Sequence, residues 1–229
     1  MVTTGILDAV LFDMDGLMFD TETLNLSGWI EAGKKHGCNI TEEDIRPQIG
    51  VAVPTARRLM TEQFGPDFDF DAVRNDRIAW SHAWIEKNGM PEKPGLRELL
   101  AWLEREGIRT AISTSSGHET VDFYLAHAPG LARYFDAVVT WEPGMQGKPA
   151  PDLFLAAARR LDARPEGCVV LEDSYNGIRA AHAAGMIPIM VPDRLPPTPE
   201  MLSLVYQKAD GLDAVVPILE RLRGQGRTR

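Results

Sequence analysis

The stretch Ala9–Glu22 reads AVLFDMDGLMFDTE, and in it a short apolar run leads directly into two aspartates. The four apolar residues from Ala9 to Phe12 have the length and composition of a strand that is buried on both faces of a parallel sheet. Asp13 and Asp15 follow, so we expect two carboxylates at the carboxyl end of this strand. Ligands of open α/β sheets bind outside the carboxyl ends of the strands. This stretch therefore predicts both a sheet and the edge of the sheet at which a site would form.

Further apolar runs in the second half of the chain alternate with helical patterns. We expect these runs to be strands, at Arg109–Ser113, Asp136–Thr140, Gly167–Glu172 and Ile187–Val191. The helices between them are expected to begin near His118, Pro151 and Ser174. Strands that alternate with helices form a parallel sheet with helices on both faces. The predicted fold class is therefore α/β, with a Rossmann-like, doubly wound parallel sheet.

One connection between strands is far too long for a single helix. The ends of the first two predicted strands, Phe12 and Ser113, lie 101 residues apart, whereas later strand ends lie 19 to 32 residues apart. Residues 21–90 have almost entirely helical patterns, and a long loop without structure of its own is uncommon in a compact domain. We therefore expect an all-helical domain at residues 21–90, inserted into an α/β core made of residues 1–20 and 91–229.

Polar side chains follow the other predicted strands as well. They are Thr114 and Ser115 after the second strand, Lys148 in the loop after the third, and Glu172 and Asp173 at the end of the fourth. The carboxyl ends of parallel strands meet at one edge of the sheet, so we expect four carboxylates, small hydroxyls and one lysine to converge there. Packed carboxylates repel one another and stay ionised only where a cation neutralises them.

Mg²⁺ is the cation that this donor set favours, because it takes oxygen ligands and keeps several waters beside one or two carboxylates and a phosphate. A bound phosphate would find a point charge at Lys148 and a hydroxyl donor at Thr114. In such a site one aspartate attacks phosphorus, and a second one on the same side of the extended chain moves the proton. The spacing of Asp13 and Asp15 supplies both carboxylates. The site therefore predicts phosphoryl transfer.

Four segments resemble, in order and in spacing, the four motifs of the haloacid dehalogenase-like (HAD) phosphohydrolases. They are VLFDMDGLMFDTE from Val10, ISTSS from Ile112, GKPAPDLF from Gly147 and LEDSYNGIRAA from Leu171. The resemblance covers essentially the whole chain. It is closest to the subgroup that contains β-phosphoglucomutases and small sugar-phosphate phosphatases, and the helical insert corresponds to the cap domain of that subgroup.

The resemblance implies a catalytic role for four positions. Asp13 would be the nucleophile that becomes phosphorylated, and Asp15 would be the general acid and base. Thr114 and Lys148 would hold the phosphoryl group during its transfer.

The resemblance also implies a Mg²⁺ site in the same place. Its ligands would be Asp13, the backbone carbonyl of Asp15, and Asp173, with Glu172 coordinating directly or through water.

Two positions in the insert separate a phosphatase from a mutase. β-Phosphoglucomutases have a histidine twelve residues after the nucleophile, where this chain has Asn25. They also have a phosphate-binding arginine shortly after a Gly-Val pair, and this chain has Val53 near that place. Loss of both features favours hydrolysis. We therefore expect a Mg²⁺-dependent phosphatase of small phosphorylated metabolites such as sugar phosphates, with a phosphosugar mutase as the alternative.

A non-enzymatic, receiver-type phosphoacceptor is a second alternative, because response-regulator receivers gather similar residues at the edge of a parallel sheet. In receivers the phosphorylated aspartate stands in mid-chain after the acidic pair. Here the pair Asp13 and Asp15 comes first, and the pair Glu172 and Asp173 comes last. A receiver also has no use for a helical insert of this size, so the enzyme is the stronger hypothesis.

The composition excludes several other classes. The chain has 229 residues and a formal net charge of −9, and its basic residues form no long run, so nucleic acid and anionic membrane surfaces are poor partners. No stretch is apolar enough to span a membrane, and the N-terminus lacks the basic region of a signal peptide. Cys38 and Cys168 stand alone in the sequence and are expected to be reduced thiols. We expect a cytoplasmic monomer or homodimer.

Several residues near the motifs have both a functional and a plainer structural interpretation. Ser115 is a candidate for substrate binding, but Ser115 and Ser116 also suit the cap of the helix expected from His118. Asn176 and Gly177 are expected to shape the loop after the fourth motif's acidic pair.

The helical insert offers no comparable motif. Trp80 and Trp84 are expected in its core, and Asp20 and Glu22 at its hinge and first helix. Four arginines are expected on solvated helix faces, and one of them could contact the distal part of a substrate: Arg57, Arg58, Arg74 and Arg77.

Overall fold

The computed structural model describes residues 7–48 and 53–225, which form two compact units. One unit contains the chain up to Phe19 and again from Glu92 onward. The other, the helical unit, runs from Asp20 to Pro91. The helical unit starts and ends one residue outside the predicted insert of residues 21–90. Each unit has a hydrophobic core of its own.

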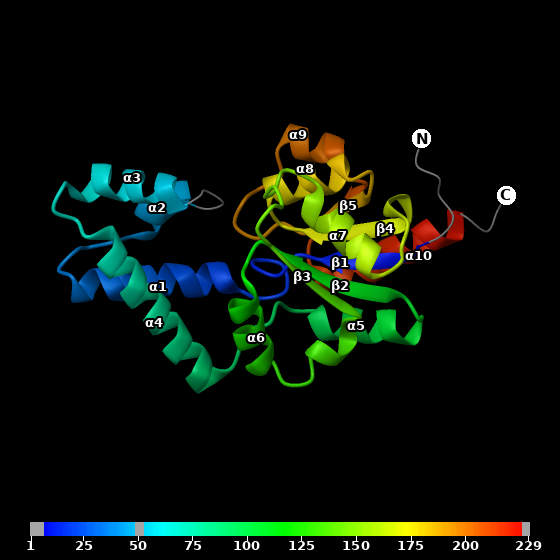
Figure 1. The fold of residues 1–229 in the computed structure, drawn as a ribbon, viewed down its shortest axis with the longest axis horizontal. Coiled ribbons are helices and arrows are strands. Elements are labelled where there is room, and N and C mark those ends of the chain that lie inside the picture. Colours follow the sequence, from blue (N-terminus) through cyan, green and yellow to red (C-terminus); the bar gives the residue numbers. More distant parts are fainter. Residues whose placement is uncertain (1–6, 49–52, 226–229) are drawn as a thin grey trace. The chain divides into compact units, whose positions relative to one another are not determined.

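A six-stranded parallel sheet forms the centre of the first unit, in the order β3-β2-β1-β4-β5-β6 (Figure 1). The strands are β1 (Ala9–Phe12), β2 (Arg109–Thr114), β3 (Ala137–Thr140), β4 (Cys168–Glu172), β5 (Ile187–Met190) and β6 (Gln207–Lys208). Because the order extends in both directions from β1, the sheet is doubly wound, and the predicted fold class is confirmed. The two-residue strand β6 has no apolar residue, and no sequence pattern predicted it.

Helices cover both faces of this sheet, which is why every residue of β1 and β4 is buried. The helices are α5 (Leu96–Arg105), α6 (His118–Ala126), α7 (Asp152–Arg160), α8 (Tyr175–Ala183), α9 (Pro199–Leu204) and α10 (Val215–Gln225). Figure 1 shows α7 and α8 side by side on one face, whereas α5, which contacts β2 and α10, lies on the other. The predicted helix starts near His118, Pro151 and Ser174 agree with α6, α7 and α8 to within one residue.

The helical unit contains α1 (Thr21–Lys35), α2 (Glu42–Ile45), α3 (Val53–Phe64) and α4 (Phe70–Asn88). Aspartates begin the two long helices. The Asp20 carboxylate accepts the backbone N–H of Thr23 at 3.3 Å, and the Asp69 carboxylate accepts that of Ala72 at 3.0 Å. Such caps satisfy N–H groups that have no partner inside the helix.

The core of the helical unit lies between α1 and α4, which pack against each other. Trp29 of α1 and Phe70 of α4 meet with their ring centroids 5.7 Å apart. Val73 of α4 and Met60 of α3 are almost fully buried in the same cluster. Trp80 and Trp84 are half-buried, so they contribute less to this core than the sequence predicted.

Short 3₁₀ segments complete the described residues, at Arg46–Gln48 (η1), Ala132–Tyr134 (η2), Pro165–Gly167 (η3) and Leu212–Ala214 (η4). Across residues 7–48 and 53–225, no helix combines the length and the apolar character needed to cross a membrane. Both cysteines are free thiols, and Cys168 is buried at the start of β4.

Candidate active site

The register of the sheet brings the motif residues to one edge. Phe12, the last residue of β1, pairs with Ile112 of β2 on one side and with Leu171 of β4 on the other. Asp13 continues this pairing, because its backbone N–H donates to the carbonyl of Leu171 at 3.1 Å. The first motif therefore leaves the sheet between the second and the fourth motifs.

A tight turn follows Asp13 and holds the first motif in place. Gly16 has a φ of +81°, a conformation that favours glycine, and its N–H donates to the carbonyl of Phe19 at 3.0 Å. The N–H of Met18 donates to the carbonyl of Met14 at 3.0 Å, and both methionine side chains are fully buried. The apolar residues between the acids thus anchor the turn that carries them.

Lys148 connects the first and the fourth motifs. Its Nζ donates to Oδ1 of Asp13 and, at 2.6 Å, to Oε1 of Glu172. The Lys148 side chain is only 8% exposed, and its Nζ lies 4.8 Å from the ring centroid of Phe154. Burial alone would lower the pKa of Lys148, but the charges of Asp13 and Glu172 raise it above its ordinary value. Lys148 therefore stays protonated inside the site.

Glu172 is fully buried, and both of its carboxylate oxygens accept hydrogen bonds from the protein. Oε1 accepts from Lys148, and Oε2 accepts from the backbone N–H of Ser174 at 2.7 Å and from its hydroxyl at 2.9 Å. A Cβ atom at Gly177 would lie 1.6 Å from Oε1, so only glycine admits this carboxylate. The expectation that Asn176 and Gly177 shape a loop was wrong, because Ser174 caps α8 and both residues lie in its first turn.

The first and fourth motifs also share an excess of negative charge. A Cβ atom at Gly16 would lie 2.5 Å from Oδ2 of Asp173, so the turn passes directly against that carboxylate. Burial raises the pKa of Asp13 to about 7 against the opposing charge of Lys148. Burial also raises the pKa of Asp173 well above its ordinary value, with the charges of Glu172 and Asp13 adding to the effect. The site gathers more carboxylates than Lys148 can neutralise.

Two hydroxyls of the second motif are fixed by hydrogen bonds. Thr114 ends β2, is buried, and its hydroxyl accepts the N–H of Ser116 at 3.0 Å. The hydroxyl of Ser116 donates to Oδ2 of Asp15 at 2.8 Å. The capping role expected of Ser115 and Ser116 was wrong, because Gly117 is the N-cap of α6 and no side chain caps that helix. Ser115 is exposed in the same turn.

Ser116 is the residue that sequence reasoning missed. A serine before a helix is typical of a cap, and its contact with Asp15 spans 101 positions of the chain. No local pattern encodes such a contact. The other predicted residues come together as two groups, Asp13 with Lys148 and Glu172, and Asp173 against the turn at Gly16.

The donor set fits a hard divalent cation. Within the described residues, no group of three His, Cys, Asp or Glu side chains forms a ready-made metal cluster. Mg²⁺ does not need one, since it usually takes one or two carboxylates and fills its other positions with water and phosphate. Asp13 and Asp173 are buried near other carboxylates that raise the pKa of both, and a bound cation would stabilise their ionised forms.

The family model of the haloacid dehalogenase-like hydrolases matches residues 7–185, which include all four motifs. The chain therefore belongs to this family of hydrolases. Its fold agrees with this membership. A solved structure of a candidate β-phosphoglucomutase from Thermotoga maritima has a TM-score of 0.80 and 26% sequence identity, and the match covers 93% of this chain and 99% of that one.

Curated relatives include named phosphatases. The fructose-1-phosphate phosphatase YqaB of Escherichia coli is 34% identical over 77% of this chain and 92% of that protein. The phosphorylated carbohydrates phosphatase of Thermotoga maritima is 30% identical over 79% of this chain and 82% of that protein. The chain is also 32% identical to a segment of the Arabidopsis thaliana chloroplastic protein SUPPRESSOR OF QUENCHING 1, of which it spans 17%. With these relatives, the chain is an enzyme of the phosphoric monoester hydrolase class.

Proposed function

We propose that this enzyme hydrolyses phosphorylated sugars and related small metabolites through a phosphorylated Asp13. The observation that carries the proposal is the buried group of Asp13, Lys148 and Glu172 at the carboxyl edge of the sheet. Phosphatase relatives named for fructose 1-phosphate and for phosphorylated carbohydrates support this substrate class.

The first step transfers the phosphoryl group to Asp13. Lys148 holds Oδ1 of Asp13, so we assign the attack on phosphorus to Oδ2. As the bond from phosphorus to the leaving alcohol breaks, Asp15 gives its proton to the alcohol oxygen. The Thr114 hydroxyl and the Lys148 ammonium stabilise the charge on the oxygens of the transferring group.

The second step returns Asp13 to its starting state. Asp15, now ionised, takes a proton from a water molecule, whose oxygen attacks phosphorus. The bond from phosphorus to Asp13 breaks, and inorganic phosphate leaves. Ser116 is a positioning residue in both steps, because its hydroxyl donates to Oδ2 of Asp15 and fixes the direction of that carboxyl group.

Asp13, Asp173 and the backbone carbonyl of Asp15 would hold Mg²⁺. When bound, this ion would supply positive charge that neutralises phosphate oxygens and favours the ionised form of Asp13. Glu172 already gives both oxygens to Lys148 and Ser174, so we propose that it orients the lysine and reaches the metal only through water.

We propose hydrolysis over mutase activity because Asn25 cannot move a proton, and its Oδ1 already accepts a hydrogen bond from Arg77 at 2.5 Å. The helical unit stands in the chain where the family has its cap, between the first and second motifs, and we propose the cap's role of substrate selection for it. The receiver-type alternative is set aside because the chain belongs to a hydrolase family. A cytoplasmic monomer or homodimer stays a prediction.

Release of inorganic phosphate from fructose 1-phosphate and p-nitrophenyl phosphate, with and without EDTA, tests the proposal. We expect Asp13→Asn to lower kcat at least about 10³-fold, because no nucleophile remains. Asp15→Asn should lower it roughly 10²- to 10⁴-fold, and EDTA should abolish turnover. Asp122→Asn, an exposed aspartate of α6, is the matched control.

An Asp13→Asn variant as fast as the parent enzyme would overturn the proposed nucleophile. Conversion of glucose 1-phosphate to glucose 6-phosphate without free phosphate would favour the mutase instead. EDTA without effect would remove Mg²⁺ from the account.

A further inference from the structure

The hydroxyl of Ser113, in the α/β unit, is buried and has no hydrogen-bond partner among the described residues. Ser113 is the last residue but one of β2, and none of its surface is exposed. A hydroxyl that leaves water without gaining a partner destabilises the fold. Ala111, two residues earlier on the same strand, has no such cost. The serine at position 113 therefore needs an explanation other than packing.

The register of the sheet identifies the residues on either side of Ser113. β1 and β2 pair Phe12 with Ile112, so the next residues, Asp13 and Ser113, stand beside each other. On its other side, Ser113 pairs with Val139 of β3. Of these two neighbours in the register, Asp13 alone is polar.

The side chains of both residues lie on the same face of the sheet, because side chains alternate along a strand. Leu11 and Ala111, two residues earlier on β1 and β2, belong to the hydrophobic cluster that includes the buried residues of α7. Asp13 meets Lys148 on this face, since the Nζ of Lys148 lies 4.8 Å from the ring centroid of Phe154 in α7. The unpartnered hydroxyl therefore lies on the face on which the nucleophile is held.

Oδ1 of Asp13 accepts from Lys148 in this structure, so it does not need the hydroxyl here. The ammonium group has three N–H groups, and it gives one to Asp13 and one to Glu172. A phosphoryl group on Asp13 would bring charged oxygens that compete for these N–H groups. Once Lys148 turns to them, Oδ1 needs another donor. The neighbouring hydroxyl of Ser113 is a donor without a partner.

Such a donor would act in the second step of the reaction. The oxygen of a water molecule bonds to phosphorus and its proton goes to Asp15, while the bond from phosphorus to Oδ2 of Asp13 breaks. The electron pair of that bond stays on the carboxylate, so negative charge grows on both oxygens of Asp13. A hydrogen bond to Oδ1 is stronger in the ionised carboxylate than in the acyl phosphate. It therefore favours the second step, whereas the first step consumes the same charge.

We propose that the hydroxyl of Ser113 donates to Oδ1 of phosphorylated Asp13 and stabilises the carboxylate as it leaves phosphorus. The inference rests on the proposed phosphatase function and adds a residue that acts in its second step. Rotation between staggered side-chain positions redirects a serine hydroxyl. Ser113 acts through Asp13 and is therefore a positioning residue.

The variant Ser113→Ala should separate kcat from kcat/KM. With p-nitrophenyl phosphate, kcat/KM covers the steps up to release of p-nitrophenol, whereas kcat also includes hydrolysis of the phosphorylated enzyme. We expect Ser113→Ala to slow that hydrolysis about 10- to 100-fold, since a hydrogen bond to a charged group is lost. Where this hydrolysis limits turnover, kcat and KM should fall together and kcat/KM should stay within about twofold of the parent value. Acid quench with radiolabelled substrate measures the phosphorylated enzyme directly.

Thermal unfolding separates this role from support of the fold. Alanine removes a buried hydroxyl that has no partner, so the Tm of Ser113→Ala should equal or exceed that of the parent enzyme. Ser113→Cys keeps a weak donor of similar size, and its phosphorylated form should decay at a rate between those of the parent and Ser113→Ala. A lower Tm together with a lower kcat/KM would mean that Ser113 only supports the fold, and would overturn the inference.

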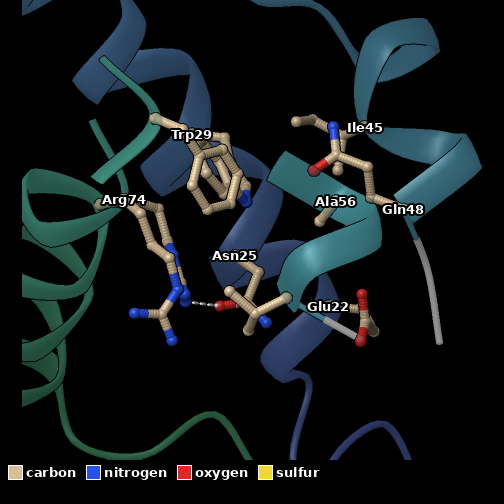
Figure 2. A pocket seen from close by; sticks show the side chains of 10 residues that line it. Glu22, Asn25, Trp29, Ile45, Gln48, Ala56 and Arg74 are labelled. Atoms are coloured by element: carbon tan, nitrogen blue, oxygen red, sulfur yellow. Dashed lines mark hydrogen bonds between the residues drawn. The ribbon is translucent and has the colours of Figure 1, made fainter. Parts of the chain in front are cut away.

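Ser81 of α4 is the matched control, because its hydroxyl is also buried and without a hydrogen-bond partner among the described residues. It lies in the helical unit, which has a pocket of about 240 Å³. Figure 2 shows Arg74 and Asn25 on one side of this pocket and Gln48 on the other. Ser81 does not line the pocket. Ser81→Ala should leave decay of the phosphorylated enzyme unchanged, and equal slowing in both variants would contradict a specific role for Ser113.

Radiolabelling distinguishes failure of this inference from failure of the proposed function. The parent enzyme should acquire an acid-stable phosphoryl label that Asp13→Asn lacks. Asp15→Asn lacks the base of the second step and should hold the label longest, so the decay rate is compared in Asp15→Asn with and without Ser113→Ala. Equal decay rates would mean that only the role of Ser113 is wrong. If Asp13→Asn acquires the same label, or the parent enzyme hydrolyses no ester, the proposed function is wrong and the role of Ser113 fails with it.

Discussion

Aspartates in the two units of this protein have pKa values shifted in opposite directions. In the helical unit, hydrogen bonds from Arg57 lower the pKa of the exposed Asp71, and those from Lys35 lower that of Asp76. In the α/β unit, burial raises the pKa of Asp13 and Asp173. Basic partners stabilise the ionised forms of Asp71 and Asp76. Burial destabilises the ionised forms of Asp13 and Asp173, and a bound cation or a proton would remove that cost.

The basic residues show the reverse arrangement. Lys148 in the α/β unit is buried with two carboxylate partners, whereas Arg74 in the helical unit lies in a pocket without an ion pair among the described residues. A charge with fixed partners suits a reaction that must be repeated with the same geometry. The fixed partners of Lys148 therefore agree with the catalytic role that we propose for the α/β unit.

The largest effect should follow from removing the charge of Lys148. We expect Lys148→Met to lower kcat/KM at least about 10³-fold on every ester, because the phosphoryl group loses its positive partner. Unfolding free energy should fall by about 3–5 kcal/mol, since Asp13 and Glu172 lose a buried counter-charge. Steady-state kinetics and urea unfolding measure the two effects.

Lys93→Met is the matched control for Lys148→Met. Lys93 pairs with Asp193 at 2.7 Å in the same unit and is also largely buried, so its loss should cost stability without a comparable loss of turnover. Equal losses of turnover in the two variants would mean that Lys148 acts only on the fold.

A methyl group at Gly177 should have the next largest effect. It would lie 1.6 Å from Oε1 of Glu172, so the carboxylate must leave its hydrogen bonds to Lys148 and Ser174. We expect Gly177→Ala to lower the free energy of unfolding by about 3 kcal/mol and to reduce turnover strongly.

Gly28 offers the same test in the helical unit. There a Cβ atom would lie 3.0 Å from the hydroxyl of Ser81, 3.1 Å from Cγ of Arg77 and 3.2 Å from the backbone carbonyl of Arg77, so each neighbour must give by only a few tenths of an ångström. Gly28→Ala should cost about 1 kcal/mol or less and keep turnover of p-nitrophenyl phosphate. If Gly28→Ala lowered turnover of p-nitrophenyl phosphate as much as Gly177→Ala does, the proposal that the α/β unit carries the reaction would be contradicted.

The stability of the metal-free enzyme should fall as pH rises from about 4 to about 7. The folded state keeps a proton on Asp13, whose pKa is raised to about 7, while the unfolded state has lost it, so the folded state binds more protons in this range. We expect Asp13→Asn to be more stable than the parent enzyme in EDTA at pH 8, by at most a few kcal/mol.

Thermal unfolding across pH 5 to 8 measures this difference. Mg²⁺ should reduce it by favouring the ionised carboxylate in the parent enzyme alone. If the stabilities of the two proteins in EDTA changed with pH in the same way, the claim that the buried Asp13 keeps a proton in the folded state would be wrong.

The smallest effect is expected for Ser116, which acts through Asp15. We expect Ser116→Ala to lower kcat/KM about tenfold for fructose 1-phosphate and less than about twofold for p-nitrophenyl phosphate, because a good leaving group needs little help from an acid. Ser116→Thr should restore the loss. Ser203→Ala, a change in an exposed serine of α9 outside the motifs, serves as the control. An equal loss on both esters would give Ser116 only a structural role.

Local patterns in the sequence were enough to predict the sheet and its active edge. β1, β4 and β5 are apolar runs, and Asp13 and Glu172 stand at the carboxyl ends of the neighbouring strands β1 and β4. Lys148 reaches both carboxylates from the loop that follows β3 at the same edge of the sheet. The same patterns did not predict α5 or β6. The two-residue strand β6 pairs with β5, Gln207 with Ile189 and Lys208 with Met190, and its own two polar residues carry no strand pattern.

Contacts between distant parts of the chain decided the rest, and only the folded molecule reveals them. The partner of Ser116 lies 101 positions away and the partner of Arg77 lies 52 positions away. The need for glycine at position 177 follows from Glu172, whose carboxylate is held by Lys148 from another loop. Periodicity reports which face of an element is buried, but it carries no information about which side chain from another element faces it. The chemistry could therefore be predicted from the sequence, whereas the residues that orient the catalytic side chains required the tertiary structure.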